Sequence, residues 1–380
     1  MRALQLTTTA SMIDQFIIPY IDLLISMGYD VDTISDYSHP GNISHDRSED
    51  LQNRLKAKNV KVFDTPIPRS LNPVAMVKAY KLVKNQIVSA HYDLINCHSP
   101  IGAAICRLAA KSERKNGTKV IYTAHGFHFY TGAPLMNWLI YYPVEKWLSR
   151  YTDVLVTINK EDYARAKAKF HALRTEYIPG IGIDMSRFNS ATSDDALRQE
   201  LGIETGSIMM LSVGELNKNK NHEVVIRAMK DLPSNIRYVI VGRGPLKDNV
   251  QALIDSLGLS DRVMLTGYRD DVARFYAAAD LFVFPSHREG LSVALMEAMA
   301  SGLPVVCGNI RGNTDLIEDG KGGYLFDPSS STEVKDCIIR MLNGDMKKMG
   351  DTNAEVIKGF DLPTVRERMT SIYRTAVENK

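Results

Sequence analysis

Short apolar runs alternate with amphipathic stretches along the first half of the chain. The apolar runs predict strands at Ala3–Leu6, Val31–Ile34, Val62–Phe63, Leu94–Cys97, Val120–Tyr122 and Val154–Ile158. Helical periodicity between them predicts helices at Asp14–Met27, Val74–Val88, Ala103–Ser112 and Glu161–Phe170. This alternation is typical of a parallel sheet covered by helices.

The segment Ile178–Asp184 interrupts the pattern, and its proline and glycines indicate a linker. A second series follows, with strands predicted at Ile208–Val213, Tyr238–Val241, Val263–Leu265, Leu281–Phe284, Val305–Val306 and Tyr324–Phe326. Its helices are predicted at His222–Met229, Asp248–Leu257, Val272–Ala278 and Ser292–Ser301.

The two series predict two doubly wound, Rossmann-like α/β domains, at residues 1–184 and 185–361. A closing helix at Pro363–Ala376, within residues 362–380, can pack on either domain, including back on the first. Ligands of open parallel sheets bind beyond the carboxyl ends of the strands. We therefore expect the two domains to face each other across a central cleft, with the functional residues directly after strands.

Composition narrows the class of protein. The chain has 380 residues, 44% of them hydrophobic and 24% charged, which is a globular composition. The net charge of +2 is too small to indicate nucleic-acid binding. No apolar run reaches the roughly 18–20 residues needed to span a bilayer. No signal peptide is apparent, and the four cysteines form no C-x-x-C pair. We expect a cytoplasmic protein with reduced thiols.

The sharpest local feature lies between Glu289 and Glu297, directly after the predicted strand Leu281–Phe284. Ser292 is a favourable N-cap and Gly302 a favourable helix stop. The free N–H groups at such a helix start suit a diphosphate. Glu297 can accept hydrogen bonds from the ribose hydroxyls, and Glu289 can reach a neighbouring sugar. The backbone expected to hold the nucleotide is that of Gly290, Leu291, Ser292 and Val293. The alternative is an ordinary helix with solvated glutamates.

The E-x7-E spacing from Glu289 to Glu297 resembles the signature of the retaining glycosyltransferases of family 4. The resemblance covers nearly the whole chain and implies the GT-B fold, in which two Rossmann-like domains flank a cleft. Further segments that resemble the family are the linker Ile178–Asp184 followed by Phe188, the loop Ser212–Asn221, Leu265–Tyr268, Ala279–Ser286 and Tyr122–Gly126. The stretch His125–Trp147 resembles bacterial enzymes of exopolysaccharide, capsule or lipid-linked oligosaccharide assembly.

The resemblance implies roles for individual residues. Lys220, with Gly214 and Lys218 in the same loop, would hold the donor diphosphate, and Tyr268 would lie at the nucleobase. His125 would contact the donor sugar near its reacting carbon. The alternatives are a surface lysine and a structural loop histidine. His98 follows the predicted strand Leu94–Cys97 and receives no role.

Two departures from the family pattern are apparent. Glu215 stands where the family usually has an arginine, and Arg243 in Gly242–Gly244 is a candidate substitute. Thr7–Ser11 replaces the family's glycine-rich loop after the first strand, so the glycine backbone freedom expected on the acceptor side is absent.

Basic and aromatic residues of the first domain suggest peripheral contact with an anionic membrane. The basic residues are Lys78, Lys81, Lys84, Arg107, Lys111 and Arg114, and aromatic and apolar residues cluster at Phe127–Tyr130 and Trp138–Tyr142. Solvated helix faces and a packed aromatic helix are the alternative interpretation.

The leading hypothesis is a retaining hexosyl- or N-acetylhexosaminyl-transferase that needs neither cofactor nor metal. It would move a sugar from a nucleotide donor, expected to be UDP-linked, to a glycan or polyprenyl-diphosphate-linked acceptor in cell-surface polysaccharide synthesis. Catalysis would depend on His125, Glu289 and Lys220. A UDP-sugar epimerase of GT-B fold and a non-catalytic sugar-nucleotide-binding protein are the alternatives.

Overall fold

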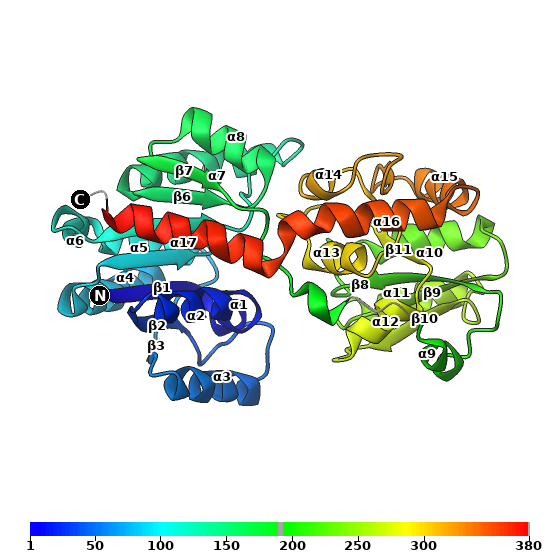
Figure 1. The fold of residues 1–380 in the computed structure, drawn as a ribbon, viewed down its shortest axis with the longest axis horizontal. Coiled ribbons are helices and arrows are strands. Elements are labelled where there is room, and N and C mark those ends of the chain that lie inside the picture. The colour runs from blue at the N-terminus through cyan, green and yellow to red at the C-terminus, as the bar shows by residue number, and fades with distance from the viewer. Residues whose placement is uncertain (189–192, 379–380) are drawn as a thin grey trace. The chain divides into compact units, whose positions relative to one another are not determined.

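The computed structural model describes residues 1–188 and 193–378. The chain divides into two compact units (Figure 1), of which unit 1 comprises Met1–Ile181 with Pro363–Lys380 and unit 2 comprises Gly182–Leu362. The division falls inside the Pro/Gly segment Ile178–Asp184, whereas the sequence boundary was set at its end.

Unit 1 is built on a sheet of seven strands in the order β3-β2-β1-β4-β5-β6-β7, and all neighbours are parallel. The strands are β1 (Arg2–Thr9), β2 (Asp30–Asp36), β3 (Lys61–Asp64), β4 (Leu94–His98), β5 (Lys119–Ala124), β6 (Val154–Thr157) and β7 (Arg174–Tyr177). The apolar runs predict all of them except β7. That strand lies at the sheet edge and is only half-buried, so it carries no apolar run.

The helices of unit 1 are α1 (Ala10–Met12), α2 (Ile18–Ser26), α3 (His45–Ala57), α4 (Pro73–Ala90), α5 (Pro100–Ala109), α6 (Lys111–Lys115), α7 (Leu135–Leu148) and α8 (Lys160–Lys169). The single helix predicted over Asp14–Met27 is instead divided. A π-helical turn at Ile13–Ile17 precedes α2, and Pro19 lies in the first turn of α2. Proline has no N–H to donate to a preceding turn, so it is tolerated at a helix start.

The closing helix α17 (Leu362–Glu378), red in Figure 1, packs on unit 1. Its buried residues are Val365, Met369, Ile372, Tyr373 and Ala376. The Tyr373 hydroxyl accepts hydrogen bonds from Gln5 Nε2 at 3.3 Å and from Asn96 Nδ2 at 2.9 Å. The last helix therefore contacts the two central strands, β1 and β4, directly.

Unit 2 contains a sheet of six parallel strands in the order β10-β9-β8-β11-β12-β13. The strands are β8 (Ile208–Val213), β9 (Ile236–Val241), β10 (Val263–Gly267), β11 (Leu281–Phe284), β12 (Val305–Gly308) and β13 (Gly323–Phe326). Every one of them overlaps a predicted strand, because continuous apolar runs are the mark of strands that are covered on both faces.

The helices of unit 2 are α9 (Asp195–Glu200), α10 (His222–Ala228), α11 (Lys247–Ser256), α12 (Val272–Ala278), α13 (Val293–Ala300), α14 (Asn313–Leu316), α15 (Ser331–Leu342) and α16 (Met346–Ile357). The sequence analysis predicted neither α15 nor α16. Yet α15 buries Val334, Cys337, Ile338 and Met341, which recur at helical spacing.

Strand order reverses at one point in each sheet. In unit 1, β1 lies between β2 and β4, and in unit 2, β8 lies between β9 and β11. The helices that follow the two central strands leave on opposite faces at such a point, which opens a crevice beyond their carboxyl ends. His98 ends β4, and Gly214 and Pro285 directly follow β8 and β11. These positions are therefore candidates for a ligand site.

A buried ion pair joins α5 to α7 in unit 1. Arg107 Nη2 lies 2.8 Å from Glu145 Oε2, and both side chains are less than a tenth exposed. The guanidinium also stacks 4.2 Å from the centroid of the Tyr122 ring. The expectation that Arg107 contributes to a basic outer face is therefore wrong: its charge is neutralised inside the unit. Arg114 is likewise paired, with Asp153 at 2.9 Å.

Glu145→Ala should lower the free energy of unfolding by about 3–5 kcal/mol, because it leaves the Arg107 charge buried without its anionic partner. Urea unfolding followed by circular dichroism measures this. Glu355→Ala, which removes an exposed pair with Lys358, is the control and should cost under about 1 kcal/mol. Equal losses of unfolding free energy in the two variants would show that breaking the buried pair costs no more than breaking the exposed one.

Candidate functional site

The segment Pro285–Ser292, which contains Glu289, connects β11 to α13 and is called the acidic turn. The Ser292 hydroxyl accepts a hydrogen bond from the Leu295 backbone N–H at 3.3 Å, and α13 begins at Val293. Gly302 follows the end of the helix with φ of +70°. The predicted N-cap and helix stop are thus confirmed. Gly290 and Leu291 lie in the turn itself, so their backbone approaches the start of the helix, whose first N–H groups lack intrahelical partners.

Glu289 and Lys220 form an ion pair between two loops of unit 2. Lys220 Nζ lies 2.7 Å from Glu289 Oε1, and both side chains are largely buried. The ammonium group also lies 4.7 Å from the centroid of the Phe284 ring, at the end of β11. The structure therefore brings together two of the residues singled out from the sequence. The ammonium group of such a pair can bind an anionic ligand in place of the carboxylate.

Two asparagines, to which no role was assigned from the sequence, connect these loops through hydrogen bonds. Asn219 Nδ2 donates to the Arg288 carbonyl at 2.9 Å, and the Asn219 carbonyl accepts from His287 N at 2.8 Å. Asn221 Nδ2 donates to the carbonyls of Pro285 at 3.2 Å and Pro328 at 2.7 Å. Asn221 adopts a left-handed backbone with φ of +53°, which asparagine tolerates better than most residues. The alternation of lysine and asparagine in this loop was the available signal.

Gly214 and Gly242 allow the ends of β8 and β9 to approach closely. A Cβ on Gly242 would lie 1.9 Å from the Gly214 carbonyl oxygen, so no other residue fits there. Arg243 follows, and its carbonyl accepts from Leu216 N at 3.1 Å. Its guanidinium lies 5.2 Å from the centroid of the exposed Tyr268 ring. Arg243 and Tyr268 thus form one surface beside the Gly214 loop.

The other two charges of the Gly214 loop point to solvent. Lys218 and Glu215 are both exposed, and Glu215 accepts a hydrogen bond from Asn217 Nδ2 at 2.9 Å. A further cation lies under the acidic turn, because Arg311 Nε donates to the Glu289 carbonyl at 3.2 Å. The sequence analysis did not single out Arg311. Its position after β12, in a glycine-flanked turn, was the signal.

Glu297 lies inside α13 with a strongly perturbed carboxyl group. Burial raises its pKa to about 7, a shift partly opposed by a hydrogen bond from Tyr276 and by the charge of Arg187. The Tyr276 hydroxyl lies 3.1 Å from Glu297 Oε2 and 3.0 Å from the Ala294 carbonyl. A carboxyl group kept out of water with few partners is ready to accept hydrogen bonds from a ligand.

In unit 1, His125 follows β5 and pairs with His98 at the end of β4. His125 Nε2 lies 3.0 Å from His98 Nδ1, and the ring centroids are 5.3 Å apart. Burial lowers the pKa of His125 to about 4. Burial, followed by the charge of His125, lowers the pKa of His98 well below its usual range. Both rings are therefore neutral at pH 7.

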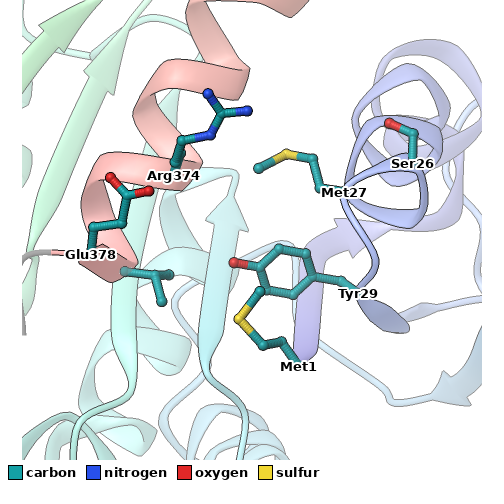
Figure 2. Close-up of a pocket in the computed structure, with 7 residues that line it drawn as sticks. Met1, Ser26, Met27, Tyr29, Arg374 and Glu378 are labelled. Atoms are coloured by element: carbon teal, nitrogen blue, oxygen red, sulfur yellow. The ribbon is translucent and has the colours of Figure 1, made fainter.

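A hollow of about 570 Å³ lies at the opposite end of the strands of the same sheet (Figure 2). Figure 2 shows Arg374 and Glu378 of α17 on one side of it, with Met27 and Tyr29 on the other. Met1 and Tyr29 precede β1 and β2, so this hollow lies beyond the amino ends of the strands. It has no part in the site formed at their carboxyl ends.

Across residues 1–188 and 193–378, no three His, Cys, Asp or Glu side chains gather as ligands of a metal ion would. Within these ranges, no helix is both long and apolar enough to cross a membrane.

Comparison with known proteins identifies the class. Residues 21–187 match the family described as Glycosyltransferase Family 4, and residues 193–356 match the family described as Glycosyl transferases group 1. The paired parallel sheets are those of a GT-B glycosyltransferase. The chain belongs to glycosyltransferase family 4, as the resemblance of its motifs implied.

Similar proteins include "Putative glycosyltransferase EpsD" of Bacillus subtilis, 38% identical over 82% of this chain and 84% of that protein. An Escherichia coli enzyme named UDP-Gal:alpha-D-GlcNAc-diphosphoundecaprenol alpha-1,3-galactosyltransferase is 27% identical over 80% of each chain. Among solved structures, Anabaena HepE in complex with UDP-glucose has a TM-score of 0.78 at 20% identity, over 99% of this chain and 100% of that chain. These names do not favour the epimerase or the non-catalytic alternative.

Glu297→Gln should remove a pH dependence of stability. A carboxyl pKa raised on folding contributes stability that is present below its ordinary value, 4.5, and is lost as pH rises through about 7. The free energy of unfolding should therefore fall by up to about 3 kcal/mol across that window in the parent protein. In the variant this part of the fall should be absent.

Urea unfolding at intervals between about pH 4 and 8.5 measures the difference. Glu204→Gln, at an exposed position, is the matched control and should follow the parent curve. Parallel curves for the parent and Glu297→Gln would contradict the raised pKa.

Proposed function

We propose that this glycosyltransferase moves a hexosyl or N-acetylhexosaminyl group from a UDP-sugar to a glycan or polyprenyl-diphosphate-linked acceptor, with retention of configuration and without a metal or other cofactor. The observation that carries the proposal is the Lys220–Glu289 ion pair, held at 2.7 Å beside the start of α13. It provides a cation for a diphosphate and an anion for sugar hydroxyls at adjacent positions.

Support for the donor comes from the residues around this pair. The turn Gly290–Val293 would bind diphosphate oxygens through backbone N–H groups, where the helix dipole favours negative charge. Glu297 would accept hydrogen bonds from the ribose hydroxyls. Tyr268 offers an exposed ring for the base, with the Arg243 guanidinium beside it. Gly214 and Lys218 of the neighbouring loop would complete the donor site. The name of the Escherichia coli relative specifies a UDP-sugar, and HepE is solved with one.

In the proposed reaction, the bond between the anomeric carbon and the diphosphate oxygen breaks as the acceptor hydroxyl attacks from the same face. The hydroxyl proton passes to an oxygen of the departing UDP, so no side-chain nucleophile is needed. Lys220 would stabilise the charge that develops on the leaving group. His125 would hold a donor-sugar hydroxyl near the reacting carbon, and Glu289 would hold another.

The acceptor proposal rests on the relatives. The Escherichia coli relative is named for an undecaprenol-diphosphate acceptor, and so is a Campylobacter jejuni relative, 35% identical over 40% of this chain. A lipid-linked acceptor used in cell-surface polysaccharide synthesis would be met at the cytoplasmic face of the membrane. We therefore include peripheral membrane contact in the proposal.

The helix α7 provides a surface for that contact. The aromatic residues of the sequence prediction pack inward: Phe127 and Phe129 are buried, and Trp138 packs against the core. The exposed side of α7 carries mainly aliphatic residues, with Leu135 72% and Leu139 61% exposed. Other large exposed apolar residues of this helix are Met136, Ile140, Val144 and Trp147.

Basic residues are exposed on another helix of unit 1. The helix α5 packs against both α4 and α7, and α4 exposes Lys78, Lys81 and Lys84. Together with Val74 and Val77, which are also exposed on α4, they combine cations with apolar side chains. That combination suits the interface of an anionic bilayer.

Lys220→Ala and Glu289→Gln should each lower kcat for sugar transfer by about 100- to 1,000-fold, because each removes a group that stabilises the transition state. The assay follows transfer from a panel of UDP-sugars to polyprenyl-diphosphate-linked N-acetylglucosamine. Lys230→Ala, at an exposed lysine remote from these loops in sequence, is the control. Inversion of the donor sugar without transfer would favour an epimerase, and the absence of any turnover would favour a binding protein.

Leu135→Glu with Leu139→Glu should weaken binding to phosphatidylglycerol-rich vesicles by about 10- to 100-fold, since two exposed leucines no longer enter the bilayer interface. Vesicle co-sedimentation measures the change. Leu173→Glu, also on unit 1 and 76% exposed, is the control and should bind like the parent. Unchanged binding by the double variant would contradict the α7 contact without affecting the donor proposal.

A further inference from the structure

A continuous chain of buried polar side chains runs from His125 to the last helix of the protein. His125 Nε2 lies 3.0 Å from His98 Nδ1, and His98 Nε2 lies 2.9 Å from Gln5 Oε1. Gln5 Nε2 then donates to the Tyr373 hydroxyl at 3.3 Å. His98 and Gln5 are fully buried, and so is Tyr373. The chain thus links β5, β4, β1 and α17 inside unit 1.

The geometry of this chain determines which ring nitrogens carry protons. Gln5 Oε1 can only accept, so His98 Nε2 must be the donor. A neutral His98 then has no proton on Nδ1, which must accept from His125 Nε2. A neutral His125 that is protonated on Nε2 has a lone pair on Nδ1. Among the described residues, His98 is the hydrogen-bond partner recorded for His125, so that lone pair is available to a ligand.

We propose that His98 is a positioning residue: with Gln5 and Tyr373 behind it, it holds His125 as the Nε2-protonated tautomer, so that Nδ1 accepts a hydrogen bond from a hydroxyl of the donor sugar. The inference rests on the proposed function, because the role of Nδ1 requires a sugar donor. The tautomer itself does not, since it is a property of the protein alone.

The Tyr373 hydroxyl is the hydrogen-bond partner of the Gln5 amide at the far end of this chain. It accepts from both Gln5 Nε2 and Asn96 Nδ2, and Asn96 Oδ1 accepts from the Thr123 hydroxyl at 3.0 Å. In the structure the amide nitrogen of Gln5 faces the Tyr373 hydroxyl and its oxygen faces His98. Loss of the tyrosine hydroxyl removes the acceptor of the amide nitrogen, so the amide could rotate by half a turn and donate to His98 instead. The tautomers of both histidines would then reverse.

The direct test is nitrogen-15 NMR of histidine-labelled protein at pH 7. The parent should show His125 and His98 as neutral rings protonated on Nε2. In Tyr373→Phe, signals of the opposite tautomer should appear for both rings. Protonation of His125 on Nδ1 in the parent protein would overturn the proposal, whatever the transfer activity.

Kinetics test the consequence for the reaction. His98→Phe should lower kcat by about 10- to 100-fold, whereas His98→Gln, whose amide can still accept from His125 and donate to Gln5, should recover most of the loss. Thermal unfolding of each variant identifies any that fail to fold. Full activity in a folded His98→Phe variant would refute the positioning role while leaving the proposed transferase function intact. A parent without transferase activity would refute the function and leave the tautomer assignment standing.

Discussion

The reversal of strand order beside β1 and beside β8 is the constraint on which each unit of this protein depends. An all-parallel sheet must be covered on both faces, so its strands are apolar and its polar residues gather where strands end. His98, Gly214 and Pro285 all occupy such ends, next to the reversal. The chemistry of the chain is therefore confined to a few short loops, and rigid strands position those loops.

In unit 2, side-chain hydrogen bonds as well as a backbone hydrogen bond connect these loops. Asn219 and Asn221 bond to carbonyls of the acidic turn, and Lys220 between them pairs with Glu289. The lysine is consequently presented in a fixed position. The exposed Glu215, which departs from the family pattern, accepts a hydrogen bond from Asn217 of its own loop. Cations at Arg243 and Arg311 flank the same region.

Unit 1 uses buried polar groups in two different ways. The Arg107–Glu145 pair joins α5 to α7. Its net contribution to stability is the attraction between the two charges less the free-energy cost of removing them from water. The hydrogen-bonded chain from His125 to Tyr373 contains only neutral groups, so its burial costs less free energy than the burial of an ion pair. Its hydrogen bonds orient the side chains. Through it the closing helix α17 takes part in the organisation of a loop that lies far away in the sequence.

The sequence alone determined the two parallel sheets, the capped helix at Ser292 and the family, because strand periodicity and motif spacing are local properties. It could not reveal β7, whose half-buried residues lack an apolar run, or the packing of α17 on unit 1. It also placed Arg107 on a surface, since a charged residue with helical spacing carries no sign of its buried partner. The Lys220–Glu289 and His98–His125 pairs join residues that are distant in sequence, so only the tertiary structure could decide them.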